Sequence, residues 1–153
     1  MKDKVEPPWR NRLGIAIAQR THTAYRELLD SARWRALESA GAWPQRLLWA
    51  STGTKDPDAP DTLYVESLAA PDTINTIPDE TLLAFAEHGR VGAPMVAGAD
   101  AAERVIADFA RQGIDAAALA RQLQNEGAEK FSKSWHQLLA RIDEKTEQPG
   151  AAR

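Results

Sequence analysis

Two short apolar segments of the sequence end in small polar side chains, and these ends are where the chain could hold a ligand. Residues 46–51 end at Ser51, which Thr52 follows, and residues 72–76 end at Thr76. Hydroxyl and amide groups at the carboxyl ends of parallel strands are typical of α/β barrels that hold a phosphorylated substrate. The positions of these groups therefore predict a phosphate-binding site built on two strands.

The same polar residues also have a purely structural interpretation. Asn75 and Thr76 could satisfy hydrogen bonds of the local turn, which both residue types often do. Lys55 lies in a polar loop after Ser51, where a lysine is commonly only solvated. From the sequence alone, both interpretations stay open.

No other group of residues suggests a catalytic or metal site. His22, His88 and His136 lie far apart, without a second ligand at i, i+4 or a nearby carboxylate cluster, so we expect no metal. Glu66 and Asp79 could act as paired acids, but helix capping explains Asp79 more simply. The absence of cysteine excludes disulfides, thiol nucleophiles and cysteine-ligated zinc. We expect no cofactor.

The elements that must position the two polar ends are short strands. Residues 46–51 form a nearly unbroken apolar run, which favours a parallel strand covered on both faces over a half-exposed one. The connection Thr52–Asp61 contains Gly53, Pro57 and Pro60, which exclude regular structure. The candidate ligands therefore lie at the junction between a strand and an irregular loop.

Helical periodicity dominates the rest of the chain. Apolar residues recur at spacings of three, four and seven from Leu13 onward, with a break near Asp30, after which Ser31 could cap a second short helix. We expect the later helices over residues 62–70, 79–89, 100–113, 115–127 and 128–146. Gly113 and Gly127 are two of the residues expected to end them. Six or seven helices and two strands cannot form a closed barrel, so the chain is either mainly helical with a strand pair or part of a larger α/β unit.

Length and charge exclude several classes of function. The 153 residues fall well below the roughly 250 of an eight-stranded α/β barrel. The net charge of −3 offers no basic surface for nucleic acid. No run of about 18 apolar residues occurs and the N-terminus is not a signal sequence, so we expect no membrane association and a cytoplasmic location. We expect disordered tails over residues 1–12 and 148–153, on either side of one structured region, residues 13–147.

Long runs of loop residues in the middle of the chain are similar to a known family. The runs are WASTGTK (Trp49–Lys55), TLYVESL (Thr62–Leu68) and APDTINTIPDETL (Ala70–Leu82). They resemble the last two strand-and-loop units of transaldolase. The later helices, with EKFSKSW (Glu129–Trp135), resemble the C-terminal extension of the longer bacterial subtype. The resemblance implies an α/β fold, a partial TIM barrel, of which this mostly helical chain holds strands seven and eight.

The resemblance also implies a reaction. Transaldolases of the pentose phosphate pathway transfer a dihydroxyacetone unit from a ketose phosphate to an aldose phosphate through a Schiff base. The Schiff-base lysine of the family lies on the fourth strand, which the resemblance places outside this sequence, so no catalytic residue is implied here. What the resemblance leaves is a phosphate-binding group of Ser51, Thr52 and Lys55, in which Lys55 replaces an arginine that is common in relatives. Lys55 is not expected to form the Schiff base, because nothing in a polar loop would lower its pKa.

Three interpretations of the whole chain follow. The chain is a C-terminal transaldolase fragment that is inactive alone and binds a sugar phosphate when the other barrel strands are supplied. Alternatively, it is a non-enzymatic helical interaction module that self-associates through apolar surface left uncovered around Trp49 and Ile74. A truncated remnant without function is the third interpretation, and the sequence does not separate it from the second.

Overall fold

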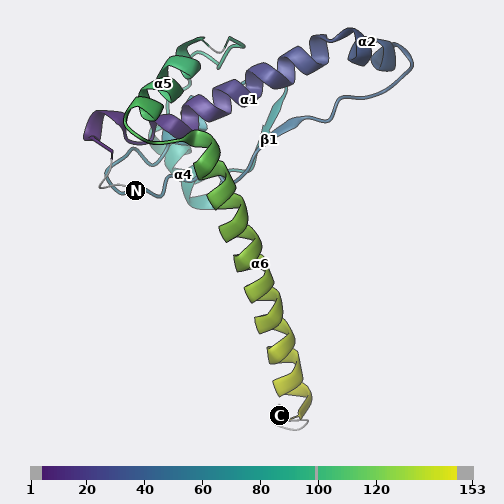
Figure 1. The fold of residues 1–153 in the computed structure, drawn as a ribbon, viewed down its shortest axis with the longest axis vertical. Helices are drawn as coiled ribbons and strands as arrows, with labels where there is room; N and C mark the ends of the chain where they lie inside the picture. Colours follow the sequence, from purple (N-terminus) through teal and green to yellow (C-terminus); the bar gives the residue numbers. More distant parts are fainter. Residues whose placement is uncertain (1–4, 99, 148–153) are drawn as a thin grey trace. The chain divides into compact units, whose positions relative to one another are not determined.

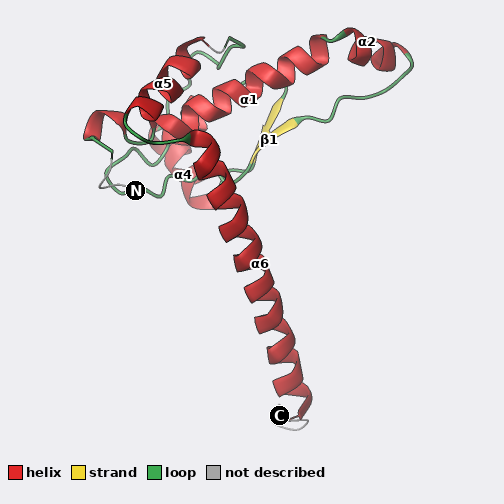
Figure 2. Cartoon of the chain, viewed as in Figure 1, coloured by secondary structure: helices red, strands yellow, loops and turns green. Residues whose placement is uncertain are grey.

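The computed structural model describes residues 5–98 and 100–147, and the chain divides into two compact units. The first unit covers residues 1–108 and the second residues 109–153. Figure 1 shows the elements in chain order, and Figure 2 shows how far helices outweigh strands. The elements up to the boundary are a 3₁₀ helix (Pro7–Trp9), α1 (Arg12–Asp30), α2 (Ala32–Ser39), β1 (Leu47–Trp49), α3 (Leu63–Ser67), β2 (Thr73–Asn75), α4 (Asp79–His88) and α5 (Asp100–Arg111), which crosses it.

The N-terminal end of the first unit carries more structure than the sequence predicts. Instead of a disordered tail up to residue 12, residues Pro7–Trp9 form a 3₁₀ helix and α1 begins at Arg12. Proline at a helix start fixes φ and gives up an N–H that would be unpaired there, which favours this short helix. Residues 1–4 and the predicted tail 148–153 lie outside the described residues.

The break between α1 and α2 lies at Ser31, as the sequence predicts. The Ser31 backbone is extended, with φ −66° and ψ 146°, and its Oγ accepts a hydrogen bond of 3.2 Å from the Trp34 N–H. This bond satisfies one of the N–H groups that the first turn of a helix leaves unpaired. The Ser31 N–H donates to the Leu28 carbonyl at 3.2 Å, so one residue both ends α1 and begins α2.

The predicted pair of parallel strands is confirmed, although both strands are short. β1 and β2 form a two-stranded parallel sheet in which Leu48 pairs with Ile74 and Trp49 with Asn75. Asp72, directly before β2, has a φ of +59°. Because a left-handed residue cannot be part of an extended strand, this backbone conformation sets the start of β2 at Thr73.

One face of the strand pair is open. The Trp49 side chain is only 8% exposed, whereas the cross-strand neighbours Leu48 and Ile74 are 46% and 41% exposed. The prediction that the first strand is covered on both faces is therefore wrong for the part of the chain that the structure describes. A continuous apolar run is typical of a strand inside a larger covered sheet, whereas this sheet has two strands within the described residues and leaves Leu48 and Ile74 partly exposed.

The core of the first unit draws on α1, α3, α5 and β1. Ala16 of α1 and Ala102 of α5 are almost completely buried, and the Arg20 guanidinium forms a bidentate ion pair with the Glu103 carboxylate that joins the same two helices. The other buried apolar side chains of this unit are Trp49, Val65, Leu68 and Ile106.

The second unit is dominated by one long helix, α6 (Ala116–Glu147). The Asp115 carboxylate accepts hydrogen bonds from the Ala117 and Ala118 N–H groups at 2.8 and 3.2 Å, and these bonds lower the pKa of Asp115. The predicted start at Asp115 is therefore confirmed.

The predicted end of that helix at Gly127 is wrong, because α6 runs through it without interruption. Glycine costs roughly 1 kcal/mol relative to alanine inside a helix. The strong helix formers on both sides, including Leu123 and Lys130, outweigh that cost. One face of α6 carries exposed large apolar side chains, namely Phe131, Trp135, Leu138, Leu139 and Ile142. Across the described residues, no helix is both long enough and apolar enough to cross a bilayer.

Candidate functional site

The carboxyl ends of β1 and β2 lie next to each other and are joined by hydrogen bonds beyond the last paired residues. The Thr76 N–H donates to the Trp49 carbonyl at 3.0 Å, and the Ser51 N–H donates to Thr76 Oγ1 at 2.8 Å. Thr76 Oγ1 also donates to the Trp49 carbonyl at 3.3 Å. The structure therefore brings together the two polar strand ends that the sequence predicts to be close. The hydrogen bonds of Thr76 are local ones, as its structural interpretation predicts.

Ser51 is the residue of this site that is best placed to meet a ligand. Its side chain is exposed, and its hydroxyl has no hydrogen-bond partner among the described residues. Its backbone has a φ of +52°, a conformation that costs a residue with a Cβ roughly 1 kcal/mol or more. The neighbouring hydrogen bonds hold the Ser51 backbone in this strained turn, with the hydroxyl free.

Thr52, the residue after Ser51, forms a part-buried hydrogen bond with Asn75 of β2. Thr52 is 4% exposed, and its Oγ1 lies 2.7 Å from Asn75 Oδ1, to which it donates a hydrogen bond. The Thr52 N–H donates to the Thr76 carbonyl at 3.4 Å. The predicted contact of Thr52 with a phosphate stays a prediction, and its burial favours a role in holding Asn75 and the strand ends in place.

Lys55 lies farther along the same loop, with its side chain exposed to solvent. Among the ion pairs between described residues, none involves Lys55. The following residue, Asp56, is anchored to the N-terminal end of α1, because its Oδ2 accepts a hydrogen bond of 3.0 Å from Asn11 Nδ2. The loop backbone beside Lys55 is therefore held, while its ammonium group is available to an anion.

Gly53 allows this loop to approach the start of α4 closely. A Cβ built at residue 53 would lie 3.2 Å from Pro78 Cγ and 3.4 Å from Thr81 Oγ1. The sequence shows Gly53 only as a turn former, and this packing role depends on a helix about 25 residues later in the chain.

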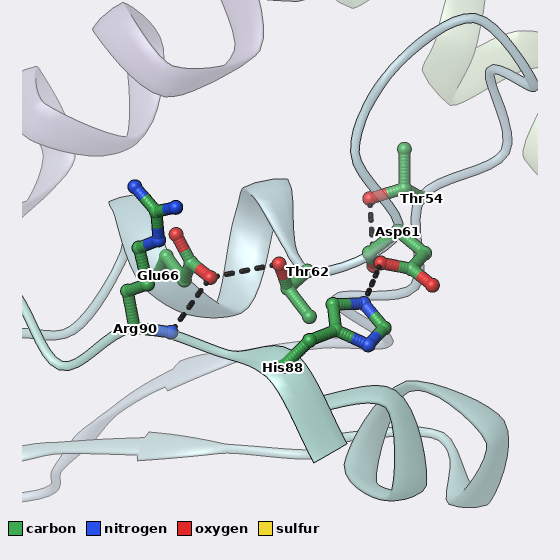
Figure 3. Close-up of polar contacts among 6 residues, drawn as sticks. All are labelled: Thr54, Asp61, Thr62, Glu66, His88 and Arg90. Atoms are coloured by element: carbon green, nitrogen blue, oxygen red, sulfur yellow. Dashed lines mark hydrogen bonds and ion pairs between the residues drawn. The ribbon is translucent and has the colours of Figure 1, made fainter. Parts of the chain in front are cut away.

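An ion pair braces the far end of the loop, and sequence reasoning missed it. His88 Nε2 lies 2.9 Å from Asp61 Oδ1, and Thr54 Oγ1 donates to the Asp61 carbonyl at 3.1 Å (Figure 3). The hydrogen bond between the two side chains raises the pKa of His88 and lowers the pKa of Asp61. The only signal in the sequence was a histidine at a helix end, where it is also favoured by the helix dipole.

Glu66, one of the two acids considered above, is occupied by local hydrogen bonds. Its Oε1 accepts from Thr62 Oγ1 at 2.8 Å and from the Arg90 N–H at 3.0 Å (Figure 3). These bonds lower the pKa of Glu66, so the carboxylate is held in its charged form. The capping role expected for Asp79 is wrong, because the N-cap of α4 is Pro78 and no side chain caps this helix. Asp79 lies instead in the first turn, where an acidic side chain stabilises the helix dipole. Glu66 therefore has a structural role.

The site contains neither a Schiff-base amine nor a set of metal ligands within the described residues. β1 and β2 carry no lysine. No group of three His, Asp or Glu side chains is arranged to hold a metal ion within residues 5–98 and 100–147. What the arrangement can do is offer hydroxyl and ammonium groups to an anion at one end of the sheet.

Comparison with known proteins places most of the chain within one family. The family model described as Transaldolase/Fructose-6-phosphate aldolase matches residues 1–142. A transaldolase from Thermobifida fusca is 47% identical over 134 residues, which make up 87% of this chain and 36% of the relative. A transaldolase from a Parafrankia species is 46% identical over 136 residues, 88% of this chain and 37% of the relative.

The Frankia alni transaldolase is 44% identical over 145 residues, 92% of this chain and 39% of the relative. The chain therefore spans well under half of the length of these curated relatives. The match also includes the first twelve residues, which lie outside the sequence runs quoted above.

Proposed function

Because this chain belongs to the transaldolase/fructose-6-phosphate aldolase family, we propose that its paired strand ends form the phosphate-binding part of an aldol-transfer site. The observation that carries this proposal is the contact between the ends of β1 and β2, where the Ser51 N–H donates to Thr76 Oγ1 and the Ser51 hydroxyl is left free. Ligands of α/β barrels bind at this end of the strands. The ligand is the phosphate group of a sugar phosphate, and the place of action is the cytoplasm.

Each candidate residue has a distinct part in this proposal. The Ser51 hydroxyl donates a hydrogen bond to a phosphate oxygen, and the Lys55 ammonium supplies a positive charge from the loop. Thr52 acts through Asn75 by keeping the strand ends in register. The ion pair of Asp61 and His88 limits the movement of the loop that carries Lys55.

The covalent chemistry requires a lysine that the described strands lack. In the family reaction, a lysine amine condenses with the ketose carbonyl, releases water and forms a Schiff base. Cleavage of the neighbouring carbon–carbon bond then releases an aldehyde and leaves the three-carbon unit as an enamine, which attacks the aldehyde of the acceptor before hydrolysis frees the lysine. We propose that this chain contributes substrate binding, and that other strands of the barrel contribute the amine.

A first experiment asks whether the polypeptide of residues 1–153 forms the covalent intermediate by itself. It is incubated with fructose 6-phosphate and borohydride and then analysed by mass spectrometry, with the full-length Thermobifida fusca transaldolase as the positive control. We expect no adduct on the 153-residue chain. An adduct on this chain would show that the assignment of the nucleophile to other strands is incorrect.

A second experiment asks whether the chain can complete a site. The part of the Thermobifida fusca enzyme that comes before its matching region is mixed with this chain, and transfer to erythrose 4-phosphate is measured. We expect activity that depends on the ratio of the two chains, and a higher KM for the donor with Ser51→Ala. No transfer at any ratio would remove the proposed function.

A non-enzymatic interaction module is the second candidate, and a specific observation favours it. The exposed apolar side chains of α6, together with Leu48 and Ile74 on the open face of the sheet, are surfaces that proteins normally cover. A dilution series in analytical ultracentrifugation tests it. Self-association at micromolar concentration supports this candidate, and a compact monomer contradicts it.

A further inference from the structure

Asn11 stands at the N-cap position of α1 but does not cap that helix. Its side chain accepts no hydrogen bond from the first turn of α1, and its backbone is left-handed, with φ 63° and ψ −2°. An asparagine at an N-cap typically has an extended backbone and accepts a hydrogen bond from an N–H of the first turn. The amide group of Asn11 is therefore available to another part of the chain.

Both polar atoms of this side chain contact residues that are distant in the sequence. Asn11 Nδ2 donates to Asp56 Oδ2 at 3.0 Å, and the Tyr64 hydroxyl donates to Asn11 Oδ1 at 3.4 Å. The contact with Asp56 is shorter and is made to a charged group, so it is the stronger of the two. Asn11 therefore connects the start of α1 to the loop of residues 52–61 and to α3.

The contact with Asp56 lies directly beside Lys55, the candidate cation of the phosphate site. On the other side of Lys55, Thr54 Oγ1 donates to the Asp61 carbonyl at 3.1 Å (Figure 3). Both neighbours of Lys55 are thus held by hydrogen bonds of their side chains. Of these two bonds, the one from Asn11 is the one that comes from outside the loop, so it ties the position of Lys55 to a long helix.

The left-handed backbone at position 11 restricts the residues that suit it. Most residues with a Cβ avoid this conformation, whereas glycine, asparagine and aspartate tolerate it well. Glycine has no side chain to reach Asp56, and aspartate would set a second carboxylate against the first. Asparagine supplies a donor for the Asp56 carboxylate and an acceptor for the Tyr64 hydroxyl, so the residue type matches the contacts that it makes.

We propose that Asn11 is a positioning residue of the phosphate site, which keeps Lys55 in place for the ligand by holding Asp56. This inference rests on the proposed function, because it requires Lys55 to bind the phosphate. It gives a part in substrate binding to a residue that the sequence assigns to a disordered tail. Because the phosphate takes no part in the bond changes, loss of Asn11 should raise the KM for the donor and leave kcat nearly unchanged.

Two substitutions of Asn11 in the complemented enzyme measure this role. Asn11→Gly keeps the left-handed backbone and removes the amide, so we expect the KM for fructose 6-phosphate to rise about threefold to tenfold. Asn11→Asp sets two carboxylates against each other and should raise the KM further. Asn125→Asp, which adds the same charge at an exposed position of α6, is the matched control and should leave the KM unchanged.

An exchange of the two side chains tests whether the contact itself matters. Asn11→Asp combined with Asp56→Asn puts the carboxylate at the start of α1 and the amide on the loop, so the hydrogen bond can form in the opposite sense. We expect the KM of this double variant to return toward that of the natural chain. A KM no lower than that of Asn11→Asp alone contradicts the proposal.

A double-mutant cycle with Lys55→Ala identifies the group through which Asn11 acts. We expect Asn11→Gly to raise the KM no further once the Lys55 ammonium is absent, and additive increases would overturn the proposal. If Lys55→Ala raises the KM and Asn11→Gly does not, the inference alone fails. If Lys55→Ala leaves the KM unchanged, the proposed role of Lys55 fails and the inference falls with it.

The 153-residue chain alone provides a measurement that needs no activity. Nitrogen relaxation in nuclear magnetic resonance gives the order parameter of the Lys55 amide. We expect this order parameter to fall in Asn11→Gly and to recover in the exchanged pair of Asn11→Asp with Asp56→Asn. An unchanged order parameter in Asn11→Gly would overturn the proposal even if the complemented enzyme shows no transfer.

Discussion

Asp61 and His88 lie 27 positions apart in the sequence and form an ion pair with an Oδ1 to Nε2 distance of 2.9 Å. The pair connects a residue near the end of the long loop after β1 to the last residue of α4. The loop carries Lys55, and its first residues form the candidate phosphate site. Its conformation therefore depends on a contact that forms only after the second strand and α4 are in place.

The pH dependence of this contact can be predicted from the two pKa shifts. The pKa of His88 is raised by its hydrogen bond with Asp61, so its stabilising contribution is complete below the ordinary value of 6.5 and is lost as the pH rises through the raised pKa. The pKa of Asp61 is lowered, so its contribution is present above the ordinary value of 3.8 and is lost as the pH falls through the lowered pKa. We expect the protection of the loop amides, relative to their intrinsic exchange rate at each pH, to be highest between these two ordinary values.

Asp61→Asn provides the test of that pairing. We expect the titration of the His88 ring, followed by nuclear magnetic resonance, to move to lower pH when the carboxylate is removed. An unchanged His88 titration would mean that the ion pair does not form in solution.

The serine between α1 and α2 should contribute measurably to the stability of the first unit. Ser31→Ala removes the acceptor of the Trp34 N–H, and we expect it to lower the free energy of unfolding by about 1 kcal/mol. Ser31→Asp keeps a side-chain acceptor at the same position and should cost much less. Urea unfolding of the three proteins measures the difference, and equal losses for Ala and Asp would contradict the capping role.

A substitution at Gly127 tests whether α6 is one continuous helix or two helices that meet at this residue. In a continuous helix, Gly127→Ala should raise helix stability by up to about 1 kcal/mol. The new Cβ meets no atom within 4 Å, so crowding does not offset this gain. If a helix ended at residue 127 with a left-handed glycine, the same substitution would be destabilising. Thermal unfolding monitored by circular dichroism distinguishes the two outcomes.

Ser51 should show a trade-off between stability and binding. Ser51→Gly relieves the φ of +52°, and we expect it to raise the free energy of unfolding by up to about 1 kcal/mol. Ser51→Ala keeps the strained backbone, so its stability should stay close to that of the natural chain. Both variants lose the hydroxyl, and both should raise the KM for the phosphorylated donor in the complemented enzyme. A Ser51→Gly protein with an unchanged KM would remove Ser51 from the phosphate site.

Local patterns in the sequence predicted the elements that depend on local chemistry. The cap at Ser31, the start of α6 at Asp115 and the pairing of two short strands each follow from a few neighbouring residues. The resemblance to a family, carried by loop residues, predicted a phosphate site at the strand ends; the contact between these ends is confirmed, and the phosphate site stays a prediction.

What the sequence did not predict depends on distant parts of the chain. The contact of Asp61 with His88 requires the loop to close over α4. The hydroxyl groups of Ser51 and Thr52 are adjacent in sequence but have different environments. The Ser51 hydroxyl is exposed and has no partner among the described residues, whereas the Thr52 hydroxyl is buried and donates to Asn75. The left-handed backbone of Ser51 accounts for this difference. Gly127 was misread because a glycine is a stop signal only where the surrounding helix is weak.

The two-stranded sheet also has a consequence for how the polypeptide is handled during synthesis. Within the described residues, β1 and β2 each have one neighbour, so both outer edges present unpaired N–H and C=O groups beside the exposed Leu48 and Ile74. Such edges accept any compatible strand, including one from an identical nascent chain. We therefore expect the polypeptide to associate through these edges when it is expressed without complementary strands. Its yield of soluble protein should then rise when such strands are co-expressed.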